Sequence, residues 1–122
     1  MDVDVFEAAR CLLGEIYGSL QEVDNGGSVR CKRAAKGKIT LYRRGVASGN
    51  CGEVAFDVES MAARAQKSEV ETRQFLAGLK AANGRATERH PRYDWPRVGF
   101  STIEEVWSVV MNLKRFFGIG HF

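Results

Sequence analysis

The sequence predicts an α+β domain in which an antiparallel sheet of three to four strands carries about three to four helices on one face. Two observations lead to this prediction. Segments with the two-residue apolar period of strands gather in the first half of the chain, and segments with the helical period lie outside them. With 122 residues, 44% of them hydrophobic, the chain is long enough to form one core without disulfides, so we expect a single domain over residues 1–122.

The first element is predicted to be a helix over residues 4–21. Asp4 and Glu7 have the spacing of a helix cap, and the DNGG segment at 24–27 is expected to end the element. The apolar stripe of this helix consists of Phe6, Ala9, Leu13, Ile16, Tyr17 and Leu20.

A hairpin is predicted next, followed by a third strand. The two strands of the hairpin carry the alternating apolar residues Val29, Cys31, Ile39 and Leu41, and AAKG at 34–37 forms the turn between them. The glycine-punctuated segment 45–52 reads as a loop. Residues 53–59 read as the third strand, although Asp57 or Ser60 is also a suitable start for a short helix.

The second half is predicted to be mainly helical. A helix begins at the capping pair Ser68 and Glu71 and ends at 83–84, and the segment 85–96, which contains both prolines, is expected to be irregular. Residues 97–100 follow as a short strand. The last helix is capped by Ser101 and Glu104 and ends at Gly118, and its stripe consists of Ile103, Val106, Trp107, Val110, Leu113 and Phe117.

Composition excludes several classes of protein. No apolar run approaches the roughly 20 residues needed to span a bilayer, and the first residues are acidic rather than basic, so we expect an intracellular, cytoplasmic protein without a membrane partner. Cys11, Cys31 and Cys51 form no C-x-x-C pair and are expected to be reduced and mostly buried. His90 and His121 lack metal-ligand spacing, so neither a metal nor another cofactor is predicted.

Charge is distributed unevenly along the chain. Residues 1–25 contain six acids and one arginine, whereas residues 28–45 contain seven lysines and arginines and no acid. On the predicted hairpin, one face carries the residues Arg30, Lys32, Lys38, Tyr42 and Arg44. Cations beside an aromatic ring suit contacts with phosphates and a stacked base. Two other interpretations remain open: the cations are ordinary solvent-face residues of an edge hairpin, or the acidic first helix lies across them.

A second candidate segment is RHPRYDWPR at residues 89–97. It interleaves the cations Arg89, Arg92 and Arg97 with the rings of Tyr93 and Trp95, and His90 lies among them. This mixture is typical of surfaces where cations contact phosphate and rings stack on bases. The alternative is that the rings of Tyr93 and Trp95 close the edge of the core while Asp94 pairs with a neighbouring arginine.

Catalytic patterns are weak, so we expect no catalytic residues, and an enzyme is less favoured than a binding protein. The segment 45–52 lacks the lysine of a phosphate-binding loop and the serine elbow of a hydrolase. Glu53, Asp57 and Glu59 alternate as nuclease carboxylates do, but Met61 stands where a catalytic lysine is needed.

The sequence therefore favours a small binding module whose basic hairpin face and Arg/aromatic loop engage an anionic partner. Nucleic acid is the leading partner, and an acidic protein surface is the other. One alternative is a small-ligand or enzymatic pocket between sheet and helices, lined by Tyr17, Phe56, Phe75 and Trp107. Another is a homo-oligomeric interaction module in which the acidic first helix and the basic hairpin meet between chains. A homodimer is also predicted through the aromatic C-terminal segment, which contains Phe116, Phe117, Ile119 and Phe122.

Overall fold

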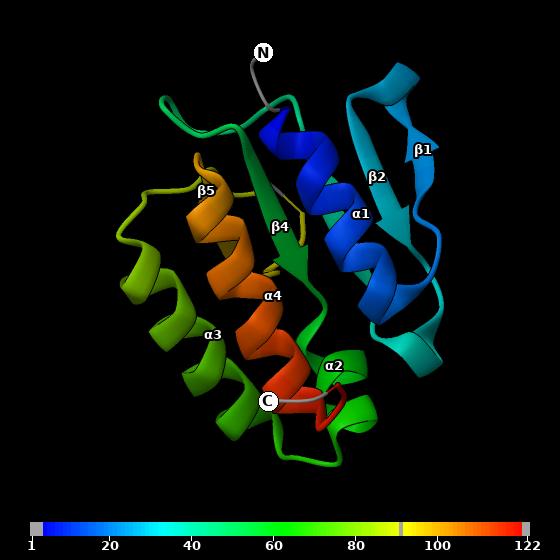
Figure 1. Ribbon diagram of the computed structural model, residues 1–122. Coiled ribbons are helices and arrows are strands. Elements are labelled where there is room, and N and C mark those ends of the chain that lie inside the picture. The colour runs from blue at the N-terminus through cyan, green and yellow to red at the C-terminus, as the bar shows by residue number, and fades with distance from the viewer. Residues whose placement is uncertain (1–3, 91, 121–122) are drawn as a thin grey trace.

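The computed structural model, which describes residues 4–90 and 92–120, confirms the α+β class (Figure 1). Its sheet is an antiparallel meander in the order β1-β2-β3-β4-β5, with one strand more than the sequence predicts. The strands are β1 (Gln21–Val23), β2 (Ser28–Cys31), β3 (Ile39–Tyr42), β4 (Gly52–Phe56) and β5 (Arg97–Phe100).

Four helices pack against one face of this sheet: α1 (Val5–Tyr17), α2 (Val58–Ala65), α3 (Glu69–Asn83) and α4 (Ile103–Phe117). Figure 1 shows α1 and α4 side by side in front of the strands, with α3 beyond α4. The core lies between these helices and the apolar face of the strands, which carries Val29, Ile39, Leu41, Val54, Phe56, Val98 and Phe100. None of the helices in the described part of the chain is long and apolar enough to cross a membrane.

The extra strand arises where the first helix was predicted to continue. Asp4 caps α1 as expected, since its carboxylate accepts a hydrogen bond from the Glu7 amide at 3.2 Å. The helix ends at Tyr17, because Gly18 adopts a φ of 82°. This positive φ does not continue an α-helix, and glycine adopts it without steric strain. Residues 21–23 then pair with β2 as an edge strand, so the boundary at residue 21 was wrong.

Two other boundaries are also corrected. The third strand ends at Phe56 rather than at 59, because the Asp57 side chain accepts from the Ser60 amide and begins α2. The last helix is capped by Thr102 rather than Ser101, with Glu105 rather than Glu104 as its partner. The caps of α3 are confirmed: Ser68 begins it and Gly84 ends it.

The stripe of α4 differs from the prediction at several residues, because Ile103 and Phe117 are only partly buried while Val109 and Phe116 are buried instead. Trp107 is 49% exposed, and the buried stripe consists of Val106, Val109, Val110, Leu113 and Phe116. The predicted end at Gly118 is confirmed, because its backbone N–H bonds back to the last turn.

The aromatic residues near the C-terminus pack within the chain. Phe116 stacks on Phe75 with 4.3 Å between ring centroids, and Phe117 meets Tyr17 edge-on at 6.1 Å. Phe122 and His121 lie outside the described residues. Because Phe116 and Phe117 already have partners in α3 and α1, they provide little free aromatic surface for a dimer.

The predicted burial of the cysteines holds only for Cys31. Cys11 and Cys51 are exposed, and all three are free thiols.

Candidate nucleic-acid interface

The face of the sheet opposite the helices is not flat but hollowed. Strand register places Arg30, Thr40, Ala55 and Arg97 in one row across four strands on this face. Thr40 and Ala55 are the small residues in the middle of that row, so they leave a depression between longer side chains. The resulting groove has a volume of about 460 Å³.

One wall of the groove is basic. Arg30 lies in β2 and Lys32 directly follows that strand. Lys38 directly precedes β3, the strand paired with β2, so the three cations are neighbours. No acidic side chain among the described residues forms an ion pair with any of the three. The Nε–H of Arg30 is buried and has no acceptor within the described part of the chain. This wall therefore has charge and hydrogen-bond donors to offer to an anion.

The other wall is aromatic and comes from the loop between α3 and β5. His90, Tyr93 and Trp95 all line the groove. Their rings form a continuous series, with centroids 4.9 Å apart between His90 and Tyr93 and 5.9 Å apart between Tyr93 and Trp95. Tyr93 is 56% exposed, which leaves much of its ring open to a stacking partner.

The imidazole of His90 shapes this aromatic loop. Its Nδ1 accepts hydrogen bonds from the backbone amides of Arg92, at 3.0 Å, and Tyr93, at 3.3 Å. His90 therefore both lines the groove and fixes the turn that presents Tyr93.

A second hollow of about 520 Å³ adjoins the first. The two share Asp24, Tyr42 and His90 as lining residues. Arg44 and Arg89 add positive charge to the second hollow, while Asp24 and Glu88 partly offset it. The open face therefore carries one extended groove whose first part is the more strongly basic.

Arg97 lines the floor of the second hollow and is otherwise buried. It is 6% exposed, its Nη1 is 3.1 Å from the Oε1 of Glu53, and its guanidinium lies 4.1 Å from the centroid of the Tyr42 ring. The guanidinium is thus already engaged by a carboxylate and a ring. Its role in this geometry is to support Tyr42 from below.

Glu53 is fully buried and joins the two loops that border the groove. Besides Arg97, its carboxylate accepts from the Ala47 amide at 2.6 Å, the Asn50 Nδ2 at 2.9 Å and the Glu88 amide at 3.1 Å. Ala47 and Asn50 belong to the β3–β4 loop, and Glu88 belongs to the aromatic loop. A buried carboxylate with four donors is fully satisfied, so it ties both loops to β4.

Further contacts hold the aromatic loop at its two ends. At the start, Arg85 Nε lies 2.7 Å from Glu105 Oε2, and this hydrogen bond lowers the pKa of the Glu105 carboxyl and raises the pKa of the Arg85 guanidinium. Near the other end, Asp94 pairs at 3.9 Å with Arg73 of α3 rather than with a neighbouring arginine. That pair is highly exposed and contributes little.

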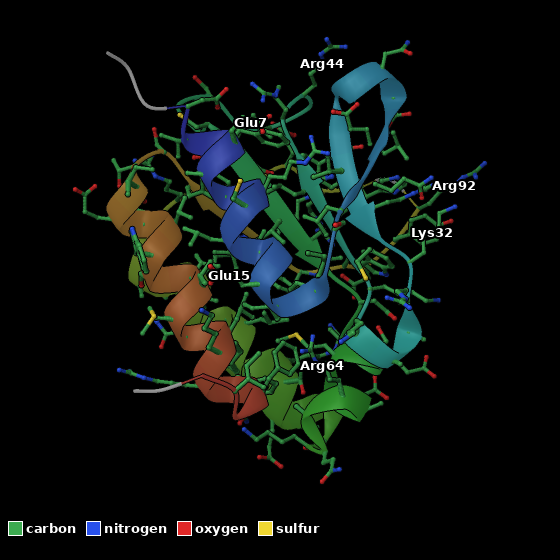
Figure 2. The ribbon with its side chains drawn as sticks, turned by 45° about the vertical axis from the view of Figure 1, so that its right-hand side comes forward. Glu7, Glu15, Lys32, Arg44, Arg64 and Arg92 are labelled. Atoms are coloured by element: carbon green, nitrogen blue, oxygen red, sulfur yellow. The ribbon has the colours of Figure 1, made fainter. Side chains whose placement is uncertain are left out.

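The acidic first helix does not cover the groove. Helix α1 packs on the opposite face of the sheet, and its Asp4 and Glu7 pair with Arg43, at 3.4 and 2.8 Å. Figure 2 shows Glu7 and Glu15 on α1, with Lys32 and Arg92 at the other side of the molecule. The acids of this helix therefore leave the basic wall uncovered.

The structure brings most of the predicted residues together. The first hollow collects Arg30, Lys32, Lys38, Tyr42, Tyr93 and Trp95, and the second adds Arg44 and Arg89. Arg92 is exposed on the aromatic loop and does not line either hollow. Sequence reasoning missed Thr40, Ala55 and Glu53, whose roles depend on strand register and on which loop covers the sheet.

Two alternative sites are not formed. Tyr17 and Phe56 are packed into the core, Phe75 stacks on Phe116 and Trp107 is on the surface, so these four residues do not line a common pocket. Glu53 is buried, Asp57 caps α2 and Glu59 lies in α2, so the three acids do not share a strand face. Within residues 4–90 and 92–120, no three acids, histidines or cysteines cluster as metal ligands would.

Comparison of the chain with protein-family models, with curated proteins and with solved structures found no match.

Proposed function

We propose that this protein binds nucleic acid in the groove on the open face of its sheet. Arg30, Lys32 and Lys38 would neutralise backbone phosphates, and Tyr93, Trp95 and Tyr42 would stack on bases. The observation that carries the proposal is that unpaired cations and open aromatic rings line the same groove. Because the two walls come from distant parts of the chain, their meeting does not follow from local sequence.

The physical chemistry of such a groove predicts the character of binding. Phosphate contacts supply affinity that falls with salt, and stacking is tolerant of sequence because every base has a π-face. With three phosphate contacts to a single strand, the affinity should fall roughly tenfold to twentyfold between about 50 and 200 mM salt. We therefore expect salt-sensitive, weakly sequence-specific binding.

The test is a titration of fluorescently labelled single-stranded DNA and RNA, read by anisotropy at both salt concentrations. The groove variant Lys32→Glu/Lys38→Glu is compared with Lys36→Glu/Arg115→Glu, which has the same net charge but whose substituted residues line neither hollow. We expect the groove variant to lose at least ten times more affinity than this control. Equal losses would show that only net charge matters and would contradict the proposal.

A second variant separates stacking from charge. Tyr93→Ala leaves the charge unchanged and removes the most exposed ring of the aromatic wall. Stacking on one ring is worth about 1–3 kcal/mol, so the affinity should fall about fivefold or more. Stronger binding to polyglutamate than to nucleic acid, unaffected by Tyr93→Ala, would instead indicate an acidic protein surface as the partner.

A further inference from the structure

The two hollows lie one after the other along β3, so the length of the groove follows from the spacing of residues along this strand. Lys38, Thr40 and Tyr42 point to the same side of the strand, and Arg44 follows beyond its end. At about 3.4 Å per residue, the four residue steps from Lys38 to Tyr42, where the second hollow begins, cover roughly 14 Å. Asp24, Tyr42 and His90 line both hollows, so the two adjoin at these residues.

Each hollow has cations of its own. Arg30, Lys32 and Lys38 serve the first hollow, and Arg44 and Arg89 serve the second. In the part of the chain that the structure describes, none of these five forms an ion pair. Figure 2 shows Arg44 at the top of the molecule and Lys32 lower on the same right-hand side. Phosphates of one chain can therefore be neutralised at both ends of the groove.

We propose that the groove is a single-strand site in which about four nucleotides are needed to reach from the first hollow into the second, with phosphates in both hollows and bases against Tyr93 and Trp95. This inference rests on the proposed function and specifies its ligand. A stacked strand advances about 3.4 Å per nucleotide, so roughly 14 Å corresponds to four nucleotides. A duplex is disfavoured because its bases are paired and cannot stack on side chains.

Acidic residues offset more of the positive charge in the second hollow than in the first. Asp24 and Glu88 lie near Arg44 and Arg89, whereas the first hollow contains Asp24 alone beside three cations. We therefore expect the first hollow to bind a phosphate more strongly. A mononucleotide should occupy the first hollow only, and a longer strand should gain affinity by reaching the second.

The test is a length series of oligothymidylates of one, two, three, four, six and eight nucleotides, competed against a labelled twelve-nucleotide strand. The affinity is expected to rise at least tenfold between one and four nucleotides and then to level off. The variant Arg44→Glu/Arg89→Glu should weaken the tetranucleotide at least fivefold and change mononucleotide binding less than twofold. The variant Lys32→Glu/Lys38→Glu should weaken both ligands, which makes the two variants controls for each other.

Three results would overturn the inference. Equal affinities for one and four nucleotides would mean a pocket for a single nucleotide, and an unchanged tetranucleotide affinity in Arg44→Glu/Arg89→Glu would mean that the strand does not enter the second hollow. A duplex that competes as well as the single strand would remove the preference for single strands. In each of these cases nucleic-acid binding itself persists, whereas failure of every length to bind would contradict the proposed function as well.

Discussion

The side chains of Glu53 and Arg97 form a buried ion pair, with 3.1 Å between Oε1 and Nη1, directly under the groove. The two residues come from adjacent strands, β4 and β5, and are 0% and 6% exposed. Glu53 reaches the loops on either side of the groove, and Arg97 supports the ring of Tyr42. The pair therefore links the fold of the sheet to the shape of the candidate site.

Loss of the Glu53 carboxylate should destabilise the protein strongly. Glu53→Ala leaves Arg97 as a buried charge without its partner, which typically costs about 3–5 kcal/mol. Urea unfolding should show this decrease in the free energy of unfolding, while Glu7→Ala, which breaks an exposed pair with Arg43, should cost less than about 1 kcal/mol. Similar small losses in both variants would contradict the role given to Glu53.

The His90 ring should control the order of the aromatic loop. In His90→Phe the ring remains but the acceptor for the amides of Arg92 and Tyr93 is lost, whereas in His90→Asn the side-chain oxygen can still accept from them. Hydrogen exchange of these two amides should become faster in His90→Phe and stay slow in His90→Asn. Equal exchange in the two variants would show that the imidazole does not hold the turn.

The bond between Arg85 and Glu105 predicts a dependence of stability on pH. Because the folded state lowers the pKa of Glu105, its contribution is complete above the unfolded value of about 4.3 and is lost as the pH falls through the lower folded value. The stability difference between the wild-type protein and Glu105→Gln should therefore be largest near neutral pH and shrink in acid below about pH 4. A difference that stays constant from neutral pH to pH 2 would contradict this linkage.

The hydroxyl of Tyr17 should be dispensable for folding. It is buried, no hydrogen-bond partner is found for its Oη among the described residues, and burial raises the pKa of the phenol. A buried hydroxyl without a partner is unfavourable by about 1–3 kcal/mol, so Tyr17→Phe should leave the free energy of unfolding unchanged or raise it. A marked decrease would reveal a partner such as a buried water.

Local sequence patterns predicted most of the fold. The alternation around Val29 and Ile39 and the caps at Asp4 and Ser68 depend only on near neighbours, so these elements formed as expected. The strand β1 was missed because three exposed or half-exposed residues carry no apolar pattern. Trp107 was assigned to the core because spacing alone does not distinguish the edge of a stripe from its centre.

The candidate site was predictable only in part. Strand alternation correctly placed Arg30, Lys32 and Lys38 on one face, because side chains alternate with a period of two. The position of the aromatic loop over that face depends on the buried bonds of Glu53 and on the pair of Arg85 with Glu105, which join residues far apart in sequence. Arg97 resembled its neighbouring arginines, and only strand pairing shows that it is buried.

The most direct test of nucleic-acid binding at the open sheet face maps the amide chemical shifts of the protein while a single-stranded oligonucleotide is added. We expect the largest shifts at residues 28–32, 38–44, 88–90 and 92–95, with little change along α1 and α4. Largest shifts along the outer surfaces of α1 and α4, with the groove residues unmoved at saturation, would contradict the central claim that the open sheet face is the binding surface.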